Sequence, residues 1–197
     1  TKTNSVKEKL PKLIDKDHRK EETQTQENDS EKVCPVKEPD TQNLSQNQPK
    51  LPLLDMTSSP RSQQNKVRIL QGKAENGDAV SQYSLGILYS IGKGVQIDKK
   101  KAFDYYMMAA EQGHVNALFS VASCYSYGKG TELNKEKAFE FYLKAAEQGL
   151  DKAQFAVAHF LRFGEGGIQK NREKAIEWYQ KAAEQGHKAS IEALKKL

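Results

Sequence analysis

The residues of this chain whose types could support chemistry are two cysteines and three of its four histidines. His114 and His187 each follow a Glu-Gln-Gly segment, so they occupy equivalent places in a repeated stretch of sequence. Equivalent places in stacked repeats lie about one repeat apart, which is too far for both side chains to bind one zinc ion. We therefore interpret these two residues and His159 as surface histidines, and we expect no metal site.

Two Gly-Lys-Gly segments, at residues 92–94 and 128–130, look like loops that could bind phosphate. A phosphate-binding loop follows a strand and begins a helix, whereas these segments follow helical patterns and end them. We interpret them as turns. The chain also has no Ser/His/Asp order and no paired cysteines of the kind that catalysis uses. The sequence therefore predicts no catalytic residue, no cofactor and no enzymatic activity.

The elements that position these residues come from an internal repeat. A paired alanine followed by Glu-Gln-Gly ends at Gly113, Gly149 and Gly186, and a looser copy ends at Gly77. The spacing of these glycines is 36 or 37 residues. A fixed period of this length is typical of a solenoid, in which stacked units share one elongated hydrophobic core.

Each repeat reads as a pair of helices. In the second unit, apolar residues from Ala117 to Tyr125 recur on one helix face, and Gly128 ends that helix. Asn134 then caps a second helix, as Asp98 and Asn171 do in the other units.

We predict a disordered polar arm over residues 1–58, a leading helix over 59–76, repeats over 77–112, 113–148 and 149–185, and a C-terminal capping helix over 186–197. In that last helix, Ile191 and Leu194 are expected to face inward. The third unit has one extra residue between its helices, which belongs in the loop.

Composition separates the arm from the repeats. All eight Tyr, all seven Phe and the single Trp lie after residue 60, and the arm has too few apolar residues to form a core. Residues 61–197 are mildly basic, with lysines scattered over helix faces, so nucleic-acid binding is not indicated. No apolar run approaches the roughly 18 residues that cross a bilayer, so we expect no membrane insertion.

The number and spacing of the cysteines indicate the cellular compartment that we expect. Cys34 and Cys124 form neither a disulfide framework nor a zinc-ligand spacing, so we expect a soluble, intracellular protein, with the cytoplasm favoured. The chain begins with Thr and is interpreted as a fragment or processed form. An upstream targeting signal or catalytic domain therefore stays an open alternative.

The repeats resemble a known family. The first unit has the run Gln82–Tyr89, then Gly92–Val95 and Ala109–Gly113, and the third has nearly the whole second-helix signature in Lys174–Gly186. With matching spacing in three units, this pattern resembles the Sel1-like repeat from about Gln71 to the C-terminus. The resemblance implies an all-α, right-handed solenoid of stacked αα-hairpins, similar to tetratricopeptide repeats. Secreted cysteine-rich members pair two cysteines in each repeat, and this chain departs from them.

The resemblance also implies a function class, since such proteins generally serve as adaptors or scaffolds that bind a protein or peptide partner. One alternative is that these repeats regulate a larger enzyme, for example a kinase or a synthase, whose catalytic part lies outside this sequence. Another is self-association through the ends of the solenoid. The partner, the organism and the pathway do not follow from the sequence.

A partner would bind the concave side, which the first helix of each unit lines in tetratricopeptide geometry. We count positions from the small residue of each first helix, which is Gly86, Ala122 or Ala158. The positions that the core does not use are those at −6, −3, +1, +4 and +5. The candidate partner-binding residues are Tyr83, Ile87, Asn116, Phe119, Ser123, Tyr127, Lys152, Phe155, His159, Arg162 and Phe163.

Tyr83, Phe119 and Phe155 form an aromatic row in this interpretation, with basic side chains beside it in the third unit. Such a face favours an extended peptide or partner helix with apolar anchors and some acidic character. In the alternative, the three rings pack between adjacent units and leave a polar groove. Hydrophobic periodicity does not separate the two readings.

Overall fold

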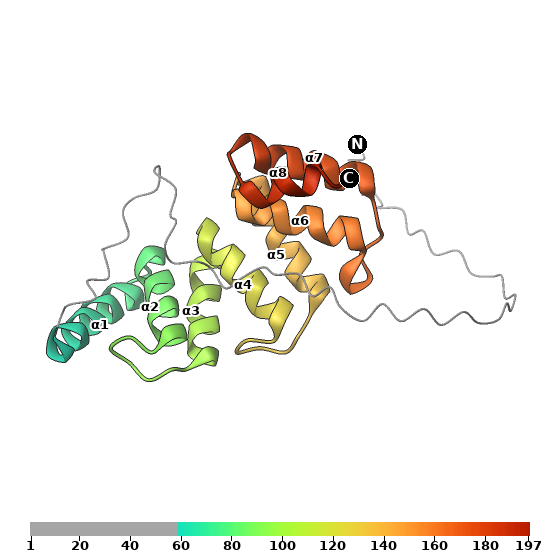
Figure 1. Cartoon of the computed structure of the whole chain (residues 1–197). Helices are drawn as coiled ribbons and strands as arrows, with labels where there is room; N and C mark the ends of the chain where they lie inside the picture. The colour runs from blue at the N-terminus through green and yellow to red at the C-terminus, as the bar shows by residue number, and fades with distance from the viewer. Residues whose placement is uncertain (1–58) are drawn as a thin grey trace, which may run out of the picture. The chain divides into compact units, whose positions relative to one another are not determined.

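The structure, a computed structural model, describes residues 59–197 (Figure 1). These residues form eight α-helices, one short 3-10 helix and no strand, which confirms the all-α class. The predicted polar arm, residues 1–58, lies outside the described residues and stays a prediction.

Six of the helices have 13 residues each, whereas the first has 16 and the last has 7, and the connections between them are short. They are α1 (Pro60–Glu75), α2 (Ala79–Ile91), α3 (Lys99–Glu111), α4 (Val115–Tyr127), α5 (Lys135–Glu147), α6 (Asp151–Phe163), α7 (Arg172–Glu184) and α8 (Lys188–Leu194). Helices α2, α4 and α6 are the first helices of three hairpins, and α3, α5 and α7 are their second helices. Each helix packs mainly against the helix before it and the helix after it, so the hairpins stack in chain order as a solenoid (Figure 1).

Capping residues determine where these helices begin and end. The second helices begin at side chains that accept a backbone N–H from the third residue beyond: Asp98, Asn134 and Asn171. The first helices end at glycines in the left-handed conformation, which a side chain would disfavour: Gly92, Gly128 and Gly164. Both sets of predicted caps are confirmed.

A small residue and a tyrosine meet inside the hairpins. In the first hairpin, a Cβ atom at Gly86 would overlap the ring of Tyr106 and lie 3.2 Å from the carbonyl oxygen of Ala102. Tyr106 is buried, and the equivalent Tyr142 and Tyr179 are each 1% exposed. These tyrosines therefore fill the core, as their helical period predicts.

The Gly-Lys-Gly segments belong to the contacts between hairpins. The second glycine of each segment, and its equivalent in the third hairpin, has positive φ: Gly94, Gly130 and Gly166. A Cβ atom at Gly130 would overlap the carbonyl oxygen of Lys99, and one at Gly166 would overlap the side chain of Lys135. Each of these two loops thus lies directly against the second helix of the preceding hairpin. The segments are turns, and the absence of a side chain at the second glycine permits the close stacking.

The extra residue of the third hairpin is accommodated in its loop, as predicted. Residues Glu165–Gly167 form the 3-10 helix η1, and Gly166 and Gly167 both have positive φ. Beyond η1, the backbone N–H of Asn171 donates to the carbonyl oxygen of Leu161 at 2.8 Å. The same hydrogen bond precedes the other second helices, so α7 begins in register despite the insertion.

Both ends of the stack have lysines where the hairpins have alanines. Lys66 and Lys73 of α1 are exposed, and they occupy the places that buried Ala102 and Ala109 have in α3. Lys195, after α8, is exposed at the place of a buried alanine of α6. Burying charged side chains at these places against a further helix would be unfavourable.

The orientation of the last helix differs from the prediction in part, because Leu194 packs against the core as expected but Ile191 does not. Ile191 is 38% exposed, whereas Ser190 is fully buried. Ser190 has the same repeat position as Ala153, which is also fully buried, so the stacking contact of α8 uses this small residue. The expectation that Ile191 faces inward is therefore wrong.

Replacing Gly130 with Ala should destabilise the stack more than replacing Gly113 with Ala. Both glycines have positive φ, 77° and 81°, so each alanine costs about 1 kcal/mol of backbone strain. Only at Gly130 does the new Cβ press on backbone, that of Lys99, which adds about 1–3 kcal/mol. Urea denaturation followed by far-UV circular dichroism measures the difference. Equal midpoints for the two variants would contradict this role of Gly130.

Candidate interaction face

The eleven candidate residues lie on α2, α4 and α6, and we call this set the first-helix face. Their exposure differs. Tyr83 and Phe119 are buried, at 8% and 6% exposed, whereas Phe163 is 47% exposed. The other eight are half-buried: Ile87, Asn116, Ser123, Tyr127, Lys152, Phe155, His159 and Arg162.

The rings of the proposed aromatic row pack inside the hairpins. Each lies 5.3–5.7 Å, centroid to centroid, from a core tyrosine of its own second helix; the pairs are Tyr83–Tyr106, Phe119–Tyr142 and Phe155–Tyr179. Tyr83 also stacks on His114, at 4.7 Å, where the next hairpin begins. The burial of Tyr83 and Phe119 favours a packing role for these two rings, although each packs mainly within its own hairpin rather than between adjacent units. A role for them in partner binding stays a prediction.

The most exposed apolar residue of the first-helix face is Phe163, at the C-terminal end of α6. The ring of His159 lies 4.5 Å from that of Phe163, and the guanidinium of Arg162 lies 5.1 Å from its centroid. One helical turn at the end of α6 therefore offers an exposed aromatic ring together with a permanent positive charge.

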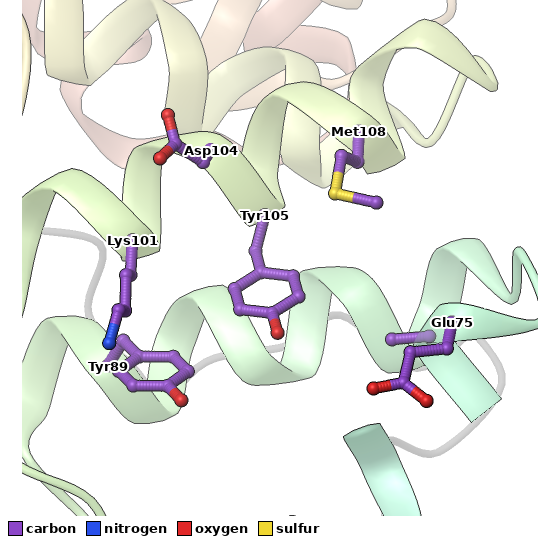
Figure 2. A pocket seen from close by; sticks show the side chains of 7 residues that line it. Glu75, Tyr89, Lys101, Asp104, Tyr105 and Met108 are labelled. Atoms are coloured by element: carbon purple, nitrogen blue, oxygen red, sulfur yellow. The ribbon is translucent and has the colours of Figure 1, made fainter. Parts of the chain in front are cut away.

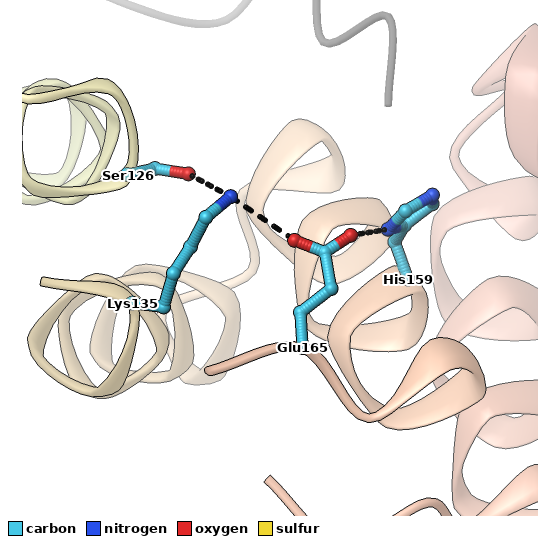
Figure 3. A network of polar contacts seen from close by, with 4 residues as sticks. All are labelled: Ser126, Lys135, His159 and Glu165. Carbon is cyan, nitrogen blue, oxygen red and sulfur yellow. Dashed lines mark hydrogen bonds and ion pairs between the residues drawn. The ribbon is translucent and has the colours of Figure 1, made fainter. Parts of the chain in front are cut away.

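A polar network beside this turn joins the second and third hairpins (Figure 3). The Nζ of Lys135 donates to Glu165 Oε2 at 3.1 Å and to Ser126 Oγ at 3.3 Å. The other carboxylate oxygen of Glu165 lies 3.0 Å from Nδ1 of His159. Glu165 belongs to η1, so the loop with the extra residue carries the carboxylate that links the two hairpins.

Neither Lys135 nor Glu165 was among the residues predicted for the site. The place of Glu165 is taken by Lys93 and Lys129 in the other two loops, so an acidic residue at a basic position was the available signal. Burial lowers the pKa of His159, and the carboxylate of Glu165 opposes that shift. With a neutral imidazole, the charges of Lys135, Arg162 and Glu165 leave this region positive.

Two other histidines act as helix N-caps. The Nδ1 of His114 accepts the backbone N–H of Ala117 at 3.3 Å, and that of His187 accepts the backbone N–H of Ser190 at 3.2 Å. An acceptor nitrogen must be unprotonated. Burial lowers the pKa of both imidazoles, which favours this state. They are half-buried residues with a structural role rather than the surface histidines expected from the sequence.

Glutamine side chains supply further contacts that the sequence analysis missed. The buried Gln82 donates to the carbonyl oxygen of Ala74 in α1 at 3.1 Å and accepts from Gln112 at 2.7 Å. The third hairpin repeats this arrangement with Gln154, Ala146 and Gln185. The Gln of two Glu-Gln-Gly segments thus helps to fasten a first helix to the end of its own second helix.

Within residues 59–197, no group of three or more His, Cys, Asp or Glu side chains could hold a metal ion. The same part of the chain has no helix with the length and apolarity to cross a bilayer. Cys124 is a buried free thiol, and burial raises its pKa to about 11, which keeps it protonated and unreactive.

A family model for the Sel1 repeat matches the chain three times, at residues 79–114, 115–150 and 151–187. The chain belongs to the Sel1 repeat family. The model begins each repeat at the start of a first helix, two residues after the limits drawn from the glycines. The family named from the sequence is thereby confirmed.

Solved structures of Sel1 repeat proteins have the same fold. A Sel1 repeat protein from Oxalobacter formigenes is 30% identical, with a TM-score of 0.63 over 68% of this chain and 99% of that chain. A protective antigen of uropathogenic Escherichia coli that displays an SLR fold is 34% identical, with a TM-score of 0.64. That match covers 68% of this chain but only 29% of the antigen.

A more distant likeness shows the fold alone. Helicobacter pylori cysteine rich protein B is 21% identical, with a TM-score of 0.55 over 70% of this chain and 98% of that chain. A search of curated proteins finds no match.

Acidification should destabilise the repeats by protonating His114 and His187. Their folded-state pKa lies below the ordinary 6.5, so folding favours the neutral form. This contribution is complete above pH 6.5 and is lost as the pH falls through the lower folded value. Each lost cap costs about 1 kcal/mol. Thermal melts at neutral pH and at about pH 5 measure the loss.

The matched control replaces both histidines with Asn, which caps α5 at Asn134 and does not titrate. The variant His114→Asn/His187→Asn should lose less thermal stability on acidification than the parent chain. If the melting temperatures of both chains fall by the same amount, the two N-caps do not account for the pH dependence.

Proposed function

We propose that the three Sel1 repeats form an interaction module that holds a protein or peptide partner on the first-helix face, and that the protein acts as an adaptor or scaffold. Membership of a family that generally mediates protein–protein interactions supports this. The stacking order supports it as well, because a solenoid offers a long continuous surface rather than an enclosed reaction chamber.

The observation that carries the proposal is a row of apolar side chains at the last residue of each first helix. Ile91 is 49% exposed and Phe163 47% exposed, and Tyr127 stands half-buried between them in the repeat order. Tyr127 and Phe163 belong to the first-helix face, and Ile91 has the equivalent position in α2. The three residues lie eight positions beyond Tyr83, Phe119 and Phe155. Exposed apolar side chains at regular spacing suit an extended partner with its own spaced anchors.

Cations beside these rings favour a partner with acidic residues. Lys129 and Lys135 place Nζ 5.5 Å and 5.8 Å from the ring centroid of Tyr127, and Arg162 lies over Phe163. An aromatic side chain and a nearby arginine together make strong interface anchors, because they bury a large area and recognise carboxylates. The proposed partner is therefore an extended peptide or a helix with apolar and acidic residues.

Removing Phe163 and Arg162 together should release the partner without unfolding the repeats. The full chain serves as bait in affinity capture with quantitative mass spectrometry, as the parent and as Arg162→Ala/Phe163→Ala. A matched control, Ile69→Ala, removes a 60% exposed apolar side chain from α1, outside the first-helix face. We expect a group of proteins that the control retains and the double variant loses at least about tenfold, as for an interface hot spot.

Thermal melts of the three chains accompany the capture, because a loss of binding counts only for a folded variant. If the double variant captures every partner as well as the parent does, the first-helix face is not the binding surface.

A further inference from the structure

A cavity of about 430 Å³ lies between α1 and α3, away from the first-helix face. Its lining includes Tyr89 of α2, which comes two residues after Ile87 of the first-helix face and so points to the roughly opposite side of the helix. In Figure 2 the ring of Tyr105 lies between Tyr89 and Glu75, and Met108 lies at the Glu75 end. Tyr89 and Tyr105 stack with their ring centroids 5.6 Å apart.

The same position carries an aromatic ring with its own cation in the other two hairpins. Phe141 and Trp178 are the equivalents of Tyr105. The Nζ of Lys144 lies 5.1 Å from the ring centroid of Phe141, and the Nζ of Lys181 lies 4.2 Å from that of Trp178. The first hairpin has Met108 at the place of these two lysines. Tyr105 therefore stands at a cation–π position from which the chain's own cation has been replaced.

Of the charged side chains around the cavity, the carboxylate of Glu75 is the one that could pair with a cation from another molecule. Lys101 lies over Tyr89 at 5.6 Å and pairs with Asp98 at 3.7 Å. Asp104 pairs with Lys100 at 3.5 Å and points away from the two rings (Figure 2). Glu75 makes no ion pair with any residue in the described range 59–197.

The pKa of Tyr105 lies above its ordinary value. Burial is the largest cause, and the negative charges of an ionised Tyr89 and of the Glu75 carboxylate raise it further. Glu75 is therefore close enough to Tyr105 for its charge to act on the phenol group.

We propose that this cavity binds an arginine side chain of a partner protein, with the guanidinium stacked on Tyr105 and its N–H groups directed to Glu75. A guanidinium is planar, stacks on aromatic rings and donates two parallel hydrogen bonds to a carboxylate, so it can satisfy both groups at once. An ammonium can satisfy the ring but has no such fork. This site lies on a different side of the stack from the first-helix face and is independent of the proposed function.

The test is an NMR titration of the ¹⁵N-labelled full chain with N-acetyl-arginine methylamide. The neutral isostere N-acetyl-citrulline methylamide is the matched ligand control. We expect saturable shifts at Glu75, Tyr105 and Met108 with the arginine probe, and binding at least about fivefold weaker with citrulline. Equal shifts with both probes would overturn the proposal.

Two variants locate the site. Met108→Lys restores the arrangement of Lys144 and Lys181, so the chain's own ammonium should cover Tyr105 and weaken arginine binding by about fivefold or more. Met108 is 43% exposed, so the lysine is accommodated without repacking. Unchanged affinity in this variant contradicts the site.

Glu75→Gln removes the carboxylate, and Glu111→Gln removes the same repeat residue one hairpin later. Only the first should weaken binding, by about fivefold. An equal effect of both would reveal general electrostatics and overturn the proposal. Two further probes test the guanidinium itself. If N-acetyl-lysine methylamide or tetramethylammonium bound more tightly than the arginine probe, the proposal would be overturned, because the site would then recognise positive charge without the guanidinium fork. The ¹H–¹⁵N spectrum of each variant reports its folding directly.

Discussion

Backbone from one hairpin must come into direct contact with the second helix of the hairpin before it, and this requirement governs the rest of the structure. Gly130 against Lys99 and Gly166 against Lys135 are the points where no side chain fits. Because the contact recurs at one repeat position, it holds successive hairpins in the same relative register. Equivalent residues then fall on the same side of the stack. The surfaces of this protein are therefore rows of equivalent positions rather than a single cleft.

Local chemistry arises where one repeat departs from the others. The extra loop residue and Glu165 create the network between Lys135 and His159. Met108, in place of a lysine, leaves Tyr105 beside the carboxylate of Glu75. In both cases the common framework supplies rigid helices, and one changed side chain supplies the polarity. A partner that contacts several repeats could combine such differences, and its specificity would come from their order along the stack.

The sequence could predict the fold because helix caps and small residues are local signals that recur. An N-cap such as Asn134 and a terminal glycine such as Gly128 mark helix ends without help from the rest of the fold. Each signal occurs three times at the same spacing, which strengthens the prediction. The positions of Tyr83 and Phe119 could not be settled in this way. A helical period gives the side of a helix on which a ring lies, but not whether a neighbouring tyrosine covers that side. The Nδ1 caps of His114 and His187 were missed since histidine is an uncommon capping residue. Ile191 was predicted to face inward because it is hydrophobic. The repeat position shows instead that Ser190, the equivalent of Ala153, is the buried residue.

Native-state hydrogen exchange of the full chain is the most direct test of whether each hairpin depends on its own core and on its immediate neighbours rather than on a globally shared core. We expect the slowest exchange in α4 and α5, which have a complete hairpin on either side, and progressively faster exchange toward α1 and α8. Equal protection of α1, α4 and α8 would contradict this expectation, because such a result requires one globally cooperative core.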